Sequence, residues 1–445
     1  MNRILTIIVT VMGCVTISAQ SLSLDSCKAL ALRNNTAVKN AALDVAAAQE
    51  VKKQAFTKYF PNVSAIAGGY YAAKPLIEYG IDDIENAAAR QFLHNLYFEY
   101  GAAMGLPDRL SLCENGVMAG VTAVQPVYMG GQIINGNKLA KVGLEAAELK
   151  SQLTEDQIFQ QVEENYWLIV SLLEKQRTIE QALSFIDTLY RDVTKAVEAG
   201  LVTRNDLLKV QIKQNELLSN KLKVNNGIVL AKALLFQIIG IEYSENLTLT
   251  DTISKEELQL PAHHAEIWGA VKRRTETQLL ELQVTAEKLK KEMAIGESLP
   301  HLIVGATASY GNLVFDRYSA NALAFATLQV PLTGWWEAAH KIRQQNILVQ
   351  KAENERADLT EKMMLETLQS WYNLQEAESQ VLLAESSVLS AEANLHDTKA
   401  NYDAGMVPVS ELLEAQTLLL QAQNQRTDAL IDLKIKSAQY QRLTR

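Results

Sequence analysis

Two long stretches of the chain carry the hydrophobic spacing of coiled-coil helices. Residues 131–197 contain no proline, and residues 335–402 contain neither proline nor glycine. At about 1.5 Å per residue each stretch could form a rod of about 100 Å, which needs partners to be stable. Steps of three and four residues define a coiled-coil seam at Ile169, Leu172, Gln176, Ile179, Leu183, Ile186, Tyr190, Val193 and Val197, and at Leu374, Ala377, Val381, Ala384, Val388, Ala391, Leu395, Thr398 and Tyr402.

The second rod repeats the first at a constant offset. The phrase Ala199-Gly200-Leu201-Val202 returns 205 residues later as Ala404-Gly405-Met406-Val407, and each copy is followed by Asp/Glu-Leu-Leu. Each glycine ends a rod, and a helical pattern resumes just after it. Each repeat is therefore expected to contain a helical hairpin with its turn at the glycine.

Short segments bordered by prolines behave differently. In residues 301–310 apolar positions alternate with smaller or more polar ones, and residues 322–330 alternate more weakly. Residues 63–71 and 117–125 correspond to them in the first repeat, where the strand prediction depends partly on the repeat itself. About ten residues suit a strand that crosses a bilayer at a tilt, and equally a strand of a soluble sheet.

The first repeat is longer than the second between its two strands. Pro61 matches Pro300 at an offset of 239 instead of 205, so 34 extra residues lie between Tyr71 and Asn115. Within this enlarged loop, apolar residues recur every four positions from Ile84 to Tyr100. The loop is expected to form either a short amphipathic helix or a flexible exposed segment.

These patterns predict a mainly α chain of two tandem repeats, each with two strands and long coiled-coil helices. The predicted divisions are a signal peptide at 1–19, a first repeat at 20–240 with strands near 62–71 and 117–126 and a hairpin at 131–239, a linker at 241–262, and a second repeat at 263–445 with strands near 301–311 and 322–331 and a hairpin at 335–442.

The leader directs the chain out of the cytoplasm. Its apolar core, Ile4 to Val11, follows Arg3 and precedes small residues that end at Ala19, as in a secretory signal peptide. A lipoprotein site at Cys14 is the alternative. Cys27 and Cys113 are expected to be isolated thiols. No later run reaches the roughly 20 apolar residues of a spanning helix, so a membrane crossing would use strands.

The sequence holds no recognisable enzyme site. The motifs of nucleotide-binding loops, zinc proteases and serine hydrolases are missing, and the adjacent pair His263-His264 would point to different sides of a helix or strand. The formal net charge of -9 argues against nucleic acid as a partner. We therefore expect no catalytic residue, no cofactor and no resident metal.

Four strands cannot close a barrel, and an open sheet edge in lipid leaves unpaired backbone groups that cost several kcal/mol each. A version of this chain that spans lipid must share its barrel with other copies. Three copies with four strands each would supply twelve, an even number that is usual for outer-membrane barrels.

At this point the chain resembles the TolC family of outer-membrane efflux proteins. The two hairpin repeats, the strand pairs, the glycine turns and the opening phrase from Leu22 to Asn35 carry the resemblance over nearly the whole mature chain. It implies a homotrimer with a 12-stranded transmembrane β-barrel in the cell outer membrane and an α-helical tunnel in the periplasm. The implied partners are outer-membrane lipid, a periplasmic adaptor (membrane fusion) protein and an inner-membrane pump of RND or ABC type.

The resemblance also implies functional positions. The two turns would be adaptor-docking tips, namely Gly200, Leu201, Val202, Thr203, Gly405, Met406, Val407 and Pro408. A periplasmic gate would involve Asp206, Tyr402, Glu411 and Glu414. Val407 stands where the family has a basic latch residue, so we expect a hydrogen-bonded latch between Asp206 and Tyr402 instead of a salt bridge. The other reading of these positions is ordinary helix caps and solvated helix faces.

A periplasmic coiled-coil protein, structural or adaptor-like, is the alternative function. It would explain the heptads, with the proline-bordered segments forming a small soluble domain. It does not explain why a pair of strands recurs at the matching place in each repeat.

Overall fold

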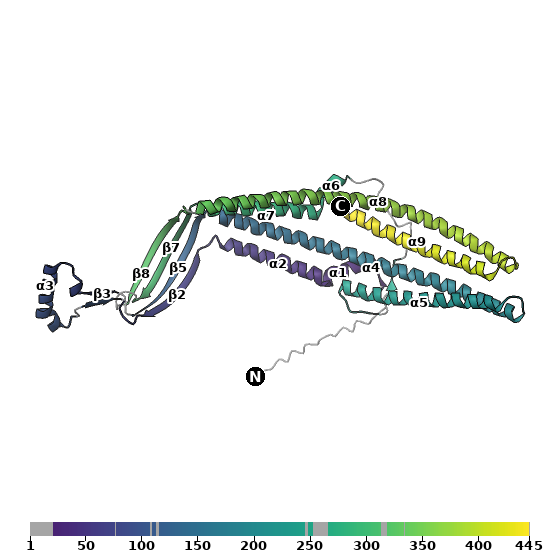
Figure 1. The fold of residues 1–445 in the computed structure, drawn as a ribbon, viewed down its shortest axis with the longest axis horizontal. Helices are drawn as coiled ribbons and strands as arrows, with labels where there is room; N and C mark the ends of the chain where they lie inside the picture. Colours follow the sequence, from purple (N-terminus) through teal and green to yellow (C-terminus); the bar gives the residue numbers. More distant parts are fainter. Residues whose placement is uncertain are drawn as a thin grey trace, which may run out of the picture. The chain divides into compact units, whose positions relative to one another are not determined.

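The computed structural model describes residues 21–75, 77–106, 109–112, 115–244, 248–251, 266–312, 318–332 and 334–444. The expected signal peptide, with Cys14, lies outside these residues, as do Cys113, His263-His264 and most of the 241–262 linker. The chain forms two compact units, and each unit takes segments from both halves of the chain (Figure 1). The predicted repeat boundaries stay a prediction.

The first unit is helical and comprises residues up to Ala47, Glu145–Leu282 and the chain from Glu353. Four helices run through both units, and four others lie in the first. The shared helices are α2 (Thr36–Thr57), α4 (Gln132–Glu198), α7 (Thr275–Glu297) and α8 (Gly334–Asp403). The first unit alone holds α1 (Leu24–Asn34), α5 (Arg204–Ile239), α6 (Ile267–Arg273), α9 (Val409–Thr444) and the short strands β1 (Ser21–Leu22) and β6 (Thr248–Leu249).

The predicted coiled-coil seams are confirmed. Every seam position on α4 and α8 is buried or half-buried, whereas most of the residues between them are exposed. Ile179, Ile186 and Val193 of α4 pack with Val210 of α5 and Leu412 of α9 in one apolar cluster, which we call the tip cluster. The hairpins α4–α5 and α8–α9 therefore pack against each other near their turns (Figure 1).

The second unit, Ala48–Leu144 and Gln283–Ala352, contains a four-stranded antiparallel sheet. Its order is β2-β5-β7-β8, which places the strand pair of one repeat beside that of the other. The strands are β2 (Asn62–Tyr71), β5 (Asn115–Met129), β7 (His301–Gly311) and β8 (Ser319–Gln329). β2 and β8 form the two edges.

Two strand bounds differ from those predicted. Pro126 lies inside β5 instead of at its end, and the pairing with β7 shifts between Pro126 and Tyr128. A proline has no N–H to give to a ladder, and a bulge absorbs that loss. β8 begins at Ser319, earlier than its weak alternation indicated, because its pairing with β7 continues from His301 to Gly311.

In the described part of the enlarged loop, the helical alternative is confirmed over a shorter range. α3 covers Ala87–Leu96, with the Asn86 side chain capping its first turn, and a π-helical turn follows at Tyr97–Gly101. Strands β3 (Ile77–Gly80) and β4 (Arg109–Leu112) pair at the base of the loop, with short 3₁₀ turns at Ile81–Asp83 and Ala102–Met104. The sequence pattern did not indicate this strand pair.

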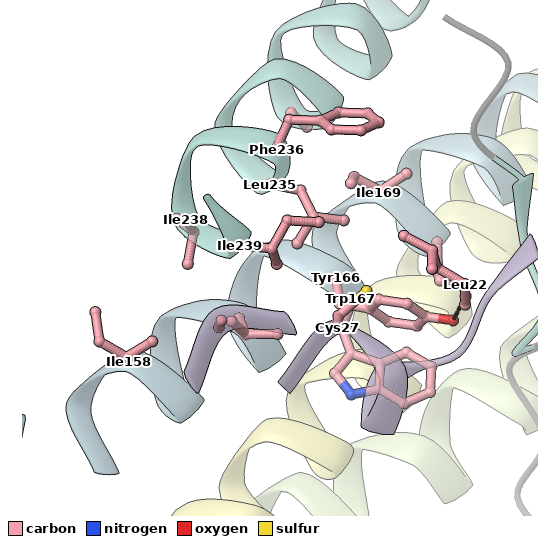
Figure 2. Close-up of a cluster of buried hydrophobic side chains, with 14 of the residues drawn as sticks. Leu22, Cys27, Ile158, Tyr166, Trp167, Ile169, Leu235, Phe236, Ile238 and Ile239 are labelled. Atoms are coloured by element: carbon pink, nitrogen blue, oxygen red, sulfur yellow. Dashed lines mark hydrogen bonds between the residues drawn. The ribbon is translucent and has the colours of Figure 1, made fainter. Parts of the chain in front are cut away.

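A buried network ties the start of the described chain to α4. The Tyr166 hydroxyl donates to the Leu22 carbonyl oxygen (3.1 Å) and accepts from the Asp251 N–H (3.3 Å), next to the parallel pairing of β1 with β6 (Figure 2). Around it pack Cys27 of α1 and Leu235 of α5, among others. Burial, followed by the nearby Asp251 carboxylate, raises the pKa of the Cys27 thiol to about 11. Cys27 is thus an inert core residue.

One helix modifies the expectation that no later segment is apolar enough to span a membrane. Over the described residues, α5 alone meets the criteria of length and composition for a spanning helix, and a third of its most apolar window is buried. Its buried residues, such as Leu235 and Ile239, belong to the cluster around Tyr166. Other apolar residues of α5, such as Leu222 and Leu230, are exposed in a single copy.

We expect Tyr166→Phe to destabilise the first unit by about 1–3 kcal/mol, because the Leu22 carbonyl and the Asp251 N–H would lose a buried partner. Thermal unfolding followed by circular dichroism would measure the change. Tyr372→Phe is the control, since Tyr372 is exposed in the matching phrase of the second repeat. Equal midpoints for the two variants would contradict the role given to the network.

Candidate functional site

The two helical turns share one backbone geometry. Gly200 and Gly405 have φ angles of 73° and 72°, which favour glycine. After α4, the N–H groups of Gly200 and Leu201 donate to the carbonyls of Val197 and Ala196. After α8, Gly405 and Met406 donate in the same way to Tyr402 and Asn401. Each turn is a Schellman cap, so the repeated phrase specifies the same tight reversal twice.

The apolar residues of the turns divide into two kinds. Leu201 and Met406 project outward, with 79% and 68% of their surface exposed. Val202 and Val407 are half-buried, and Val202 packs on the tip cluster. Their place at helical turns predicts that all four residues are exposed, and this prediction is wrong for the valines, since the turn folds them back onto the helices. Thr203 then caps α5 by accepting the Asp206 N–H.

Asp206 is engaged within its own turn of helix. The Thr203 hydroxyl donates to its Oδ2 atom at 2.7 Å, and the Lys209 ammonium lies 3.3 Å from Oδ1. The Thr203 hydrogen bond, followed by Lys209, lowers the pKa of the Asp206 carboxyl. Lys209 occupies the place that Glu414 has in the second repeat, so the two repeats differ in charge here.

Tyr402 lies close enough to the Asp206 carboxylate for its negative charge to act on the Tyr402 hydroxyl. Burial raises the pKa of the Tyr402 hydroxyl, and the carboxylates of Asp206, Asp403 and Asp192 raise it further. Its ring packs on the tip cluster. The described residues of one copy include no hydrogen bond between Asp206 and Tyr402, and their latch stays a prediction.

Glu411 and Glu414 share an exposed face of α9. The intervening Leu412 and Leu413 are buried, so the helix turns both carboxylates away from its packed side. Within the described part of the chain neither is paired with a basic side chain. Two free carboxylates thus lie within the first two turns of α9, next to the Gly405 turn.

The register of the sheet separates two faces of different chemistry. On one face every side chain of the paired central rows is apolar. The cross-strand row of Ala65, Val121, Ala308 and Ala322 is typical, and Tyr310 lies toward one end of this face. The other face carries hydroxyl and amide groups, including the bonded pair Thr122 and Thr307 (3.0 Å between their Oγ1 atoms). A sheet with lipid on one side and water on the other has this division.

The sheet is also without fixed charge. None of β2, β5, β7 and β8 contains Asp, Glu, Lys or Arg. Nearly all of β2 and β8 is exposed in a single copy, and each pairs on one side only. Sequence reasoning found these strands and the alternation of β7, which the register confirms. For the other three strands the alternation is weaker, and only the register across strands shows their faces.

Comparison with known proteins gives a consistent result. Residues 29–241 match the family described as outer membrane efflux protein. None of the curated protein sequences compared with the chain matches it.

Several solved structures share the fold. The structure of CusC, described in connection with transmembrane channel formation, has a TM-score of 0.79 at 15% identity, with 94% of this chain and 91% of that chain covered. The CmeC outer membrane channel of Campylobacter jejuni has a TM-score of 0.79 at 15% identity, with 95% and 85% covered. The outer membrane protein VceC of Vibrio cholerae has a TM-score of 0.74 at 16% identity, with 95% and 96% covered.

The helical hairpins and the uncharged two-faced sheet thus have the fold of outer-membrane channels. Over residues 29–241 the chain is similar to the outer membrane efflux protein family, and its location in the outer membrane follows from that similarity. The family and the similar structures are transport proteins, not enzymes.

Proposed function

We propose that this protein is the trimeric outer-membrane channel of a tripartite efflux or type I secretion system. It would be a passive exit duct across the periplasm and the outer membrane. The observation that carries the proposal is the sheet, with its two open edges, one face whose central rows are all apolar, and no fixed charge.

The open edges are the reason for an oligomer. In lipid, the unpaired N–H and C=O groups along β2 and β8 would each cost several kcal/mol. Pairing β8 of one copy with β2 of the next removes both edges. Three copies of the four-stranded sheet would close a barrel of twelve strands, with the apolar face toward lipid.

The helices would continue this barrel as a periplasmic tunnel. Each copy contributes the hairpins α4–α5 and α8–α9, so three copies would present six turns at the tunnel entrance. Those turns would dock a periplasmic adaptor, and an inner-membrane pump of RND or ABC type would supply energy and choose the cargo. The enlarged loop between β2 and β5 would lie over the extracellular mouth of the barrel.

A soluble periplasmic coiled-coil protein is the competing function. It would need its strands to form a sheet with a water-compatible surface. The apolar face of the sheet and the outer-membrane location of the family both count against it.

Gel migration tests the trimer and the barrel together. Extracted from the outer-membrane fraction without heating, the protein is expected to migrate as a trimer, and after boiling as a single chain. A closed barrel resists detergent because its backbone groups are all paired. Recovery from the soluble periplasmic fraction as a heat-insensitive species would point to the coiled-coil alternative.

Charged substitutions at the turns test docking. We expect Gly200→Arg and Gly405→Arg each to abolish export, since the left-handed turn would be strained by about 1–2 kcal/mol and its apolar tip would gain a charge. Apart from the neighbouring residues, no atom lies within 4 Å of a Cβ added at either glycine, and the turns are exposed, so the helices and the trimer should remain intact. Ser184→Arg, at an exposed position of α4, is the control. Unchanged export with the glycine variants would remove the turns from the docking surface.

The acidic pair tests the gate. In a trimer, Glu411 and Glu414 would form two rings of three carboxylates inside the entrance, which would favour cations. The variant Glu411→Gln/Glu414→Gln is expected to lower cation selectivity in planar bilayers and to weaken block by multivalent cations. Glu361→Gln on α8, far along the chain from the turns, serves as the control. A double variant with unaltered selectivity would place the selective ring elsewhere.

A further inference from the structure

One aromatic side chain of the sheet lies over a glycine. Phe325 of β8 is directly opposite Gly305 of β7 in the register. A methyl group added at Gly305 would lie 2.8 and 2.9 Å from Cε1 and Cε2 of the Phe325 ring, and closer still to Cζ. Phe325 is also the one residue of β8 that is half-buried instead of exposed. The distal edge of the Phe325 ring therefore occupies the space that a side chain at Gly305 would fill.

Position 305 is a glycine because of the space that the Phe325 ring needs, and not because of its backbone conformation. Gly305 is not among the residues with positive φ, so another residue could adopt its backbone geometry. What another residue could not do is leave room for the ring. Carbon atoms in contact prefer a separation of about 3.5–4.0 Å, so a methyl group at Gly305 would displace Phe325.

Phe325 stands on the polar face of the sheet. Alternation along β8 places it with Asn321 and Thr327, and alternation along β7 places Gly305 with Thr307, whose hydroxyl bonds Thr122. In the proposed barrel this face lines the interior, because hydroxyl and amide groups would be unsatisfied in lipid. The inference thus rests on the proposed function.

We propose that Gly305 holds Phe325 against the wall of the barrel and thereby sets the bore through which solutes leave. Three copies would place three such rings at one level of the barrel. Released from Gly305, each ring would project from the wall into the interior. The wall around it combines hydroxyl, amide and apolar side chains without charge, which suits uncharged and amphipathic organic solutes and makes their size the property that is selected.

A cysteine reporter tests the bore without depending on the periplasmic gate. The reporter Thr327→Cys lies on the same face, two residues closer than Phe325 to the helical end of β8. The background also carries Cys113→Ser, so that Cys27, which is buried, is the other thiol among the described residues. Whole cells would be treated from outside with a small charged methanethiosulfonate and, separately, with a bulky polyethylene-glycol maleimide. Gly305→Ala is expected to slow labelling by the bulky reagent several-fold and to leave the small reagent nearly unaffected.

Two further variants test whether the displaced Phe325 ring causes the slower labelling. Gly68→Ala lies on the same face with open space around its added methyl group, so labelling should stay at the parental rate. Adding Phe325→Ala to the Gly305→Ala protein should restore the rate of labelling by the bulky reagent. Equal labelling in the Gly305→Ala and Gly68→Ala proteins, or a loss that Phe325→Ala does not restore, would overturn the inference alone. If the small reagent fails to reach Thr327→Cys in the parent, the interior face and the channel itself are both wrong.

Discussion

The backbone groups along the outer edges of β2 and β8 impose the constraint on which the rest of the structure depends. A sheet of four strands leaves a row of unpaired N–H and C=O groups at each edge, and lipid offers them no partner. This one requirement links the fold of a single chain to an assembly of several. It also explains why each repeat carries a strand pair instead of a single strand, since an added pair returns the chain to the end of the sheet at which its helices begin.

The helices meet a different requirement, because a rod of 67 or 70 residues is stable only when its apolar side is covered. The tip cluster and the cluster around Tyr166 supply that cover within the first unit. The Schellman caps at Gly200 and Gly405 allow each hairpin to reverse in a few residues, so that the seam of one helix continues onto the next. Apolar residues left at the turns are then free for a partner.

Charged side chains are absent from the four strands of the sheet and gather near the helical turns. The two ends of the proposed channel would therefore select solutes by different properties. The strands carry no Asp, Glu, Lys or Arg, so the barrel would discriminate between solutes by their size and not by the sign of their charge. Near the turns, Asp206, Asp403, Glu411 and Glu414 gather negative charge. Any preference for cations would therefore arise at the periplasmic end, where narrowing brings carboxylates of neighbouring copies together.

The sequence by itself determined the seams, the hairpin turns and the four strands, and it offered a helix as one of two readings of the enlarged loop. Each of these follows from local spacing, from proline or from glycine, or from the repeat. Tertiary structure decided what depends on distant partners: the bulge that admits Pro126 into β5, the burial of Val202, and the contact of Phe325 with Gly305. The pairing of β1 with β6 beside Tyr166 joins residues more than 200 positions apart. Local patterns specify how a segment folds, whereas register and long-range contacts decide which surface it presents.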